Sequence, residues 1–251
     1  MPTSSPDIAF RFMGPAHVGV IALTAVLPVV LSVLARKIGS AGITRAIALV
    51  ICAVLLINEM VHWGYGIVVD GFGEFVIDYL PLHICGMALF ILTFAVLTRN
   101  QIAYEIAYFW GLAGTLQAVV TPDLQNGFPS YDFVQYFITH TGIVTGVLFT
   151  TWAMAMRPSP VSVARTFVLT NLFMFVIGGV NRLLGSNYMF LCRPPEGKSP
   201  FFFLGWPWYI VFLEGVGLAL ILLLYLPFPL CDLLRRRRAE RAGSSTSRMS
   251  R

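Results

Sequence analysis

The chain has 251 residues, of which 57% are hydrophobic and only 12% carry a charged side chain. Soluble domains carry roughly 25% charged residues, so the composition excludes a soluble globular protein and favours an all-α, polytopic membrane helical bundle surrounded by lipid. The net charge of +5 arises from residue 232 onward, where seven arginines and two acidic residues occur. It therefore belongs to a tail and does not indicate a nucleic-acid-binding face.

Seven apolar stretches follow one another along the chain, and each reaches roughly the 20 residues that a membrane-spanning helix needs. They cover residues 14–35, 43–63, 80–98, 102–121, 133–156, 161–184 and 204–231. The fourth stretch is the least apolar, since it contains Glu105 and Gln117. The sequence thus predicts about seven transmembrane helices in a single domain over residues 1–231, followed by a basic, disordered tail over residues 232–251.

Lysine and arginine residues orient the bundle, because they are enriched in the loops on the cytoplasmic side. Thirteen of the seventeen fall in the tail and in alternate loops on one side, and the others are Arg11, Arg182, Arg193 and Lys198. The richer side is predicted to be cytoplasmic, which places the N-terminus outside when the number of spans is odd. We expect a multi-pass protein of the bacterial inner or plasma membrane, whose arginine-rich tail binds anionic phospholipid and which has no nucleic-acid partner.

Polar side chains are costly inside a bilayer, so their depth is informative. In the predicted orientation, six of the seven spans carry polar residues near their outer ends. The candidate substrate-binding residues in this layer are Asn58, Glu59, His62, Gln117, Asp123, Asn181, Arg182 and Glu214. If these side chains point inward, they form a polar pocket open to the outer surface that binds membrane lipids. The alternative is that each one only hydrogen-bonds a neighbouring helix.

Cys85 is a candidate nucleophile in the same layer, because a nearby imidazole can take the thiol proton and leave a reactive thiolate. His83 and His140 are the candidate bases. His83 lies only two residues from Cys85, so on one helix their side chains diverge by about 200°. His140, from a facing span, is the better partner, and the pair suits acyl transfer. The alternative is that Cys85 is a small packing residue.

Two other interpretations use the same polar layer. Its histidines, Cys85 and Glu59 are suitable ligands for zinc or iron, but the spacing of His62, His83 and His140 matches no metal motif. No metal or other cofactor is therefore predicted. A non-enzymatic transporter, sensor, or metal- or small-molecule-binding protein is the alternative to an enzyme.

Five strings of the chain are specific enough to indicate a family. They are LPLHIC (80–85), YFWGLAGTLQ (108–117), TPDL (121–124), NYMFL (187–191) and WPWY (206–209). Together they resemble the bacterial YwaF family of integral membrane proteins, over nearly the whole chain. This resemblance implies the membrane architecture and says little about activity.

Residues 81–84 (PLHI) and 138–140 (ITH) are also similar, more distantly, to vertebrate membrane acyltransferases that move polyunsaturated acyl chains between phospholipids. Those proteins use a cysteine at the start of one span and a histidine on a later one, and the histidine corresponds to His140. The position of their cysteine is Leu82 here, and Cys85 lies three residues later, almost one helical turn on. The resemblance implies a lipid acyltransferase or hydrolase that uses His140 and Cys85.

Overall fold

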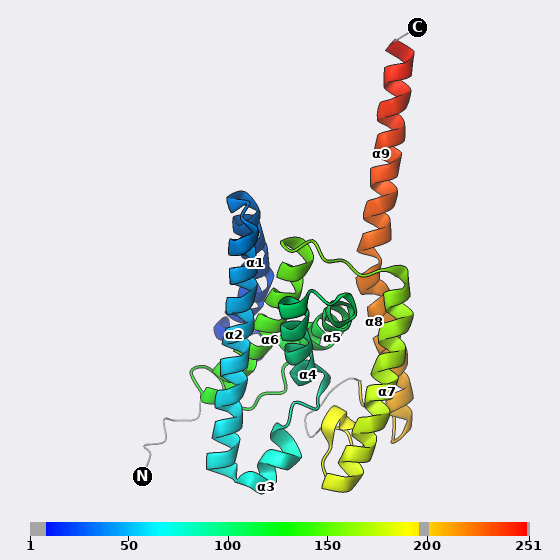
Figure 1. Cartoon of the computed structure of the whole chain (residues 1–251). Coiled ribbons are helices and arrows are strands. Elements are labelled where there is room, and N and C mark those ends of the chain that lie inside the picture. Colours follow the sequence, from blue (N-terminus) through cyan, green and yellow to red (C-terminus); the bar gives the residue numbers. More distant parts are fainter. Residues whose placement is uncertain (1–8, 196–200, 250–251) are drawn as a thin grey trace.

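The computed structural model describes residues 9–195 and 201–249. For residues 240–249 it describes the backbone only. The described chain is helical throughout except for loops and one isolated β-bridge between Ala9 and Asn126. The long helices are α1 (Pro15–Ile38), α2 (Ala41–Tyr65), α4 (Ile84–Thr98), α5 (Gln101–Val120), α6 (Tyr131–Trp152), α7 (Pro160–Leu184), α8 (Trp208–Tyr225) and α9 (Pro227–Met249) (Figure 1). The predicted all-α helical bundle is confirmed.

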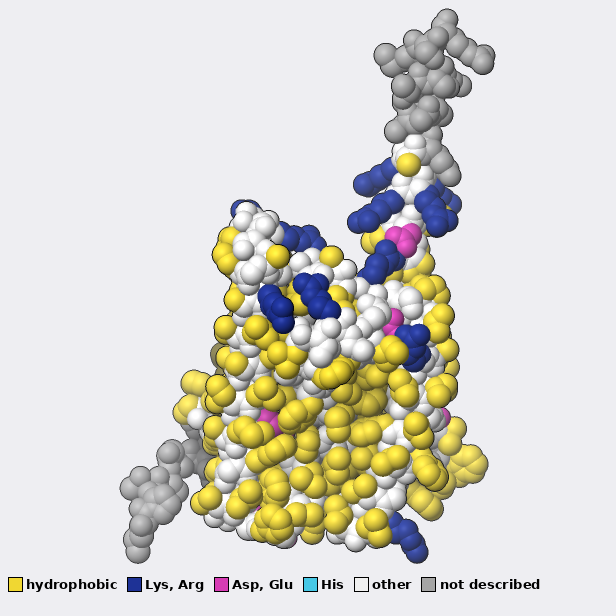
Figure 2. Space-filling model, viewed as in Figure 1, with side chains coloured by type: hydrophobic (Ala, Val, Ile, Leu, Met, Phe, Trp, Pro, Cys, Tyr) yellow, Lys and Arg dark blue, Asp and Glu magenta, His cyan; other side chains and the backbone are white. Residues whose placement is uncertain are grey.

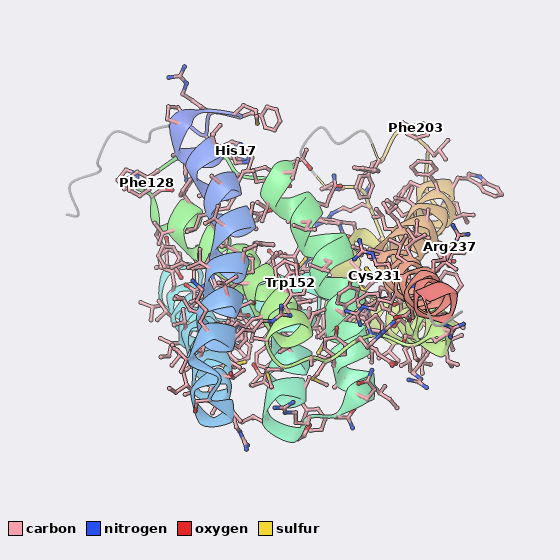
Figure 3. All side chains as sticks on the ribbon, turned by 90° about the horizontal axis from the view of Figure 1, so that it is seen from above. His17, Phe128, Trp152, Phe203, Cys231 and Arg237 are labelled. Carbon is pink, nitrogen blue, oxygen red and sulfur yellow. The ribbon has the colours of Figure 1, made fainter. Side chains whose placement is uncertain are left out.

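Short elements connect some of these helices on the side opposite the C-terminus. They are η1 (Gly66–Asp70), α3 (Phe72–Glu74), η2 (Phe75–Tyr79) and η3 (Tyr188–Phe190). Viewed from above, α1 with His17 lies at one side of the bundle, and α9, marked by Cys231 and Arg237, lies at the other (Figure 3). Helix α9 extends beyond the bundle (Figure 1). It includes residues 232–249, which belong to the tail that the sequence predicts to be disordered.

Five described helices are long and apolar enough to cross a membrane: α1, α2 with η1, α6, α7, and α8 with α9. The segment Phe72–Tyr79 and α4 form a bent pair, at 80°, that could provide a sixth span. Helix α5 is absent from this group of described helices, and its position explains its polarity. It packs against α4, α6, α7 and α8, so most of its surface faces protein. Seven spans and their orientation remain predictions.

The centre of the bundle is packed through two glycines on α6, four residues apart. A Cβ on Gly142 would lie 2.6 Å from a methyl group of Leu55 on α2, and a Cβ on Gly146 would lie 2.6 Å from one of Leu92 on α4. Both leucines are fully buried. Small residues at this spacing let transmembrane helices approach closely and gain van der Waals contacts, so α6 holds α2 and α4 against one face.

Replacing Gly146 by alanine is expected to lower the free energy of unfolding by about 1–3 kcal/mol, because the added methyl group overpacks the buried Leu92. The measurement is SDS-induced unfolding in mixed micelles. Gly179→Ala on α7 is the matched control, since nothing lies within 4 Å of its added Cβ. That variant should change stability by no more than about 1 kcal/mol. Equal stability of the two variants would contradict the packing argument.

Basic side chains gather at the end of the bundle that carries α9, and few appear at the other end of the face shown in Figure 2. Arg36 donates from Nε and Nη2 to the carbonyl oxygen of Trp152 at 3.0 and 2.5 Å. Arg99 donates to the carbonyl of Met154 at 3.4 Å. These arginines therefore hold the α6–α7 loop while providing positive charge. Lys198 lies outside the described residues.

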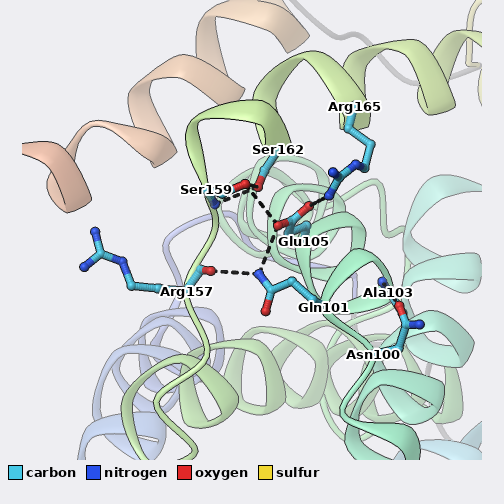
Figure 4. A network of polar contacts seen from close by, with 8 residues as sticks. All are labelled: Asn100, Gln101, Ala103, Glu105, Arg157, Ser159, Ser162 and Arg165. Carbon is cyan, nitrogen blue, oxygen red and sulfur yellow. Dashed lines mark hydrogen bonds and ion pairs between the residues drawn. The ribbon is translucent and has the colours of Figure 1, made fainter.

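A buried polar network at this basic end joins α5 to α7 (Figure 4). The Glu105 carboxylate, whose side chain is 1% exposed, forms an ion pair with Arg165. It also accepts hydrogen bonds from Gln101 Nε2 at 2.9 Å and from Ser159 Oγ at 3.4 Å. Ser159 further joins a capping box with Ser162 at the start of α7. The charge of Glu105, which makes the fourth apolar stretch unusual, is thus partnered by a cation and two neutral donors.

Candidate functional site

A cavity of about 670 Å³ is enclosed by helices α5, α7 and α8, by the first residues of α4, and by the loop after η3. Its volume falls within the range of small-molecule sites, roughly 300–1,000 Å³. Most of its walls are aromatic and aliphatic, as with Phe109, Phe167, Met174 and Leu213. Of the predicted site residues, those that line it are His83, Cys85, Gln117, Asp123 and Glu214. The cavity is therefore mainly apolar, with a few polar groups placed along it.

The polar residues of α2 lie in a different part of the bundle. Asn58 donates from Nδ2 to Thr139 Oγ1 at 2.8 Å and to the carbonyl of Gln135 at 3.1 Å, which ties α2 to α6. Glu59 is 5% exposed and accepts a hydrogen bond from Trp63 Nε1 at 2.8 Å. His62 packs on the ring of Tyr79 and faces a second hollow, which contains Asp70, Glu74 and Asp78. The described contacts of Asn58 and Glu59 are with neighbouring side chains and backbone.

Asn181 fixes the loop that follows α7. Its side chain is buried, and its Nδ2 donates to the carbonyl of Tyr188 at 2.9 Å. Its Oδ1 accepts hydrogen bonds from Ser186 Oγ at 2.8 Å and from the Tyr188 amide at 2.9 Å. Arg182, the next residue, is exposed. The structure thus places Asn181 behind the cavity wall, where it holds η3 in place.

Tyr188 connects that loop to the segment before α4. Its hydroxyl donates to the carbonyl of Val76 at 2.9 Å and accepts from the amide of Leu80 at 3.1 Å. Burial raises the pKa of the Tyr188 hydroxyl, so the group stays protonated and keeps its donor role.

The next residue, Met189, has a left-handed backbone (φ 58°), and its amide donates a hydrogen bond to Nδ1 of His83 at 3.2 Å. Left-handed conformations of bulky residues are strained and often occur at functional sites.

Cys85 is the second residue of α4, with its thiol beside α5. A Cβ on Gly114 would lie 3.5 Å from Cys85 Sγ, so the glycine leaves room beside the sulfur. Thr115, the residue after Gly114, is buried, and its hydroxyl has no hydrogen-bond partner among the described residues. Both Cys85 and Gly114 line the cavity. Cys85, which is half-buried, is therefore part of the cavity wall beside Gly114.

His140 lies on α6 and is not among the described residues that line the cavity. Its ring stacks on Tyr136 with centroids 4.0 Å apart, and its Nδ1 lies 2.7 Å from the Tyr136 carbonyl oxygen. The Tyr136 hydroxyl donates to the carbonyl oxygen of Ala118 on α5 at 3.1 Å. Tyr136 therefore connects His140 on α6 to α5, the helix that also lies beside Cys85. Sequence analysis missed Tyr136, although its position four residues before His140 places both on one helical face.

Among the described residues, no three His, Cys, Asp or Glu side chains are grouped closely enough to hold a metal ion. Three histidines form hydrogen bonds with backbone groups of different residues: His83 with Met189, His140 with Tyr136, and His17 with Met13 and Val119. The zinc or iron interpretation therefore finds no ligand set in the described part of the chain.

Comparison with known proteins gives one family. The model of the TMEM164 family matches residues 12–225. An uncharacterised protein of Treponema pallidum (strain Nichols) is 29% identical over 157 residues, which cover 59% of this chain and 62% of that protein. The match thus spans less than two thirds of the relative's length. No solved structure matches the chain significantly.

Proposed function

Because the chain belongs to the TMEM164 family of membrane proteins, we propose that it is a lipid acyltransferase or hydrolase whose cavity holds an acyl chain beside Cys85. The family match includes every predicted site residue. The resemblances to the YwaF family and to vertebrate phospholipid acyltransferases remain predictions, and so does a bacterial cell-membrane location. The second of these resemblances supports the choice of reaction.

The observation that carries the proposal is a thiol in the wall of an apolar cavity. Apolar walls favour a hydrocarbon chain, because burying it removes apolar surface from water at roughly 25 cal/mol per Å². Lipid is also the molecule available to a protein with several apolar helices long enough to span a membrane. A cysteine exposed to such a cavity can form a thioester with a bound acyl group.

The tautomer of His140 suits a base. The carbonyl oxygen of Tyr136 can only accept a hydrogen bond, so Nδ1 of the neutral ring must carry the hydrogen. Nε2 then keeps its lone pair. In the proposed reaction Nε2 takes the proton of Cys85, directly or through one water, and Sγ attacks the ester carbonyl. The ester C–O bond breaks, the departing alcohol takes the proton from His140, and a thioester remains.

The second half of the reaction releases the acyl group. An acceptor hydroxyl of a lysolipid, or of water, gives its proton to Nε2 of His140 and attacks the thioester carbonyl. The C–S bond breaks, and the thiolate of Cys85 recovers the proton from His140. A lysolipid acceptor makes the protein a transferase, and water makes it a hydrolase. The same residues serve both reactions, and the acceptor decides between them.

Covalent labelling tests this proposal. The full chain in nanodiscs is incubated with phosphatidylcholine that carries an alkyne-tagged acyl chain, and the protein is analysed for a hydroxylamine-sensitive label. We expect a label on the wild type and none on Cys85→Ala. Cys52→Ala is the matched control, because Cys52 is 3% exposed in the core and does not line the cavity. Absence of label on the wild type, or equal labelling of Cys85→Ala, would contradict the proposal.

A further inference from the structure

His83 is held in the opposite tautomer to His140. The Met189 amide donates to Nδ1 of His83, so this nitrogen carries a lone pair, and in the neutral ring the hydrogen must be on Nε2. The ring lines the cavity, and no described residue accepts a hydrogen bond from Nε2. An N–H group that the described protein does not use is therefore available to a molecule in the cavity.

We propose that His83 is a hydrogen-bond donor to the ester carbonyl of the bound acyl lipid, through Nε2–H, and that it is not a base. The identification of the acceptor as an ester carbonyl rests on the proposed function. During thioester formation this oxygen becomes an oxyanion, and a fixed donor stabilises that charge more strongly than it stabilises the ground-state carbonyl. His83 and His140 then have separate roles, as donor and as base.

The surroundings of His83 hold its ring in place. The ring packs edge-on against Tyr188, with centroids 5.4 Å apart, and against Phe190 at 5.3 Å. Tyr188 is itself held by buried Asn181 through two backbone hydrogen bonds, and Ser186 Oγ donates a further hydrogen bond to Asn181 Oδ1. These contacts set the position of the Met189 amide, which selects the tautomer. Asn181 therefore acts on the cavity through His83, without lining it.

The position of His83 relative to Cys85 agrees with this role. His83 is the N-cap residue of α4, with an extended backbone (φ −77°, ψ 153°), and Cys85 is the second helical residue. Side chains two residues apart diverge by about 200° only when both residues are helical. His83 lies before the helix, so this divergence does not apply to it, and both residues line the same cavity.

Histidine NMR tests the inference without requiring turnover. The full chain with Cys85→Ala, labelled with ¹⁵N-histidine, is placed in nanodiscs, and the His83 signals are assigned by their loss in His83→Gln. We expect a neutral ring with hydrogen on Nε2 at neutral pH. Alkyne-tagged phosphatidylcholine should shift the Nε2–H signal, and the dialkyl ether analogue, which has the same headgroup but no ester carbonyl, should leave it unchanged. A hydrogen on Nδ1, or an equal shift with the ether analogue, would overturn the proposal.

Two replacements of His83 separate its two nitrogens. Glutamine keeps an N–H near the position of Nε2, whereas asparagine keeps an acceptor near Nδ1 for the Met189 amide. We expect His83→Asn to slow the labelling of Cys85 by about a hundredfold, and His83→Gln to slow it much less. The reverse order would show that His83 only supports the loop. If neither the wild type nor any variant is labelled, the proposed acyl-transfer reaction is wrong. The NMR experiment, which needs no turnover, still tests whether His83 is a hydrogen-bond donor.

Discussion

Replacement of Arg165 by alanine is expected to destabilise the protein by about 3–5 kcal/mol, because it leaves the Glu105 carboxylate buried without its cationic partner. The Glu105 side chain is 1% exposed, so water cannot replace the guanidinium. The remaining donors, Gln101 and Ser159, are neutral and compensate only part of the lost interaction. This replacement should have the largest effect on stability of those considered.

The measurement is the free energy of unfolding from SDS titration in mixed micelles. Arg157→Ala is the matched control, since Arg157 forms a bidentate ion pair with Asp232 at 3.0 and 2.7 Å whose side chains are 48% and 42% exposed. Exposed pairs contribute roughly 0–1 kcal/mol. A double variant, Glu105→Gln with Arg165→Ala, should recover part of the loss because it removes the buried charge. Equal losses for Arg165→Ala and Arg157→Ala would show that the network at Glu105 contributes no more than a surface pair.

The largest expected effect on activity is that of His140→Asn, which should slow acyl labelling of Cys85 by about 10²–10⁴-fold. The asparagine amide can still donate to the Tyr136 carbonyl, as Nδ1 of His140 does, so the helix keeps that contact. It has no group that can take the proton of Cys85. The replacement thus removes the base while it preserves the local hydrogen bond.

His17→Asn is the control for a histidine with a structural role. Its Nδ1 accepts from the Met13 amide at 3.1 Å and its Nε2 donates to the Val119 carbonyl at 2.9 Å, so both nitrogens are used within the protein. This variant should lose stability but label Cys85 at the wild-type rate per folded molecule. The rate is read from the time course of in-gel fluorescence after attachment of a dye to the alkyne. Wild-type labelling of His140→Asn would exclude His140 as the base.

The sequence by itself was enough to predict the architecture. Hydropathy is a local property of the sequence. A run of about 20 apolar residues forms a helix in a bilayer independently of the other helices, because its backbone groups must hydrogen-bond within the segment. The apolar stretches 14–35, 133–156 and 161–184 correspond to α1, α6 and α7. Glu105 and Gln117 marked the fourth stretch as unusual, and the structure accounts for this, because α5 is enclosed by other helices.

Which polar residues share one cavity was decided by the tertiary structure. The depth of Asn58, Asn181 and Glu214 along their helices predicts that they share one layer. Depth does not determine which way each helix is turned about its axis, and that rotation depends on packing, as at Gly142 and Gly146. Only Glu214 of these three lines the cavity, while Asn58 and Asn181 bond to other parts of the protein.

The roles proposed for the two histidines also depend on the tertiary structure. From the sequence alone, His83 and His140 are alternative bases for Cys85, because an imidazole has the same chemistry in either position. The distinction comes from their backbone partners: the Met189 amide can only donate, and the Tyr136 carbonyl can only accept. Met189 lies 106 residues from His83 in the chain, so only the folded bundle brings them together and assigns each ring its tautomer.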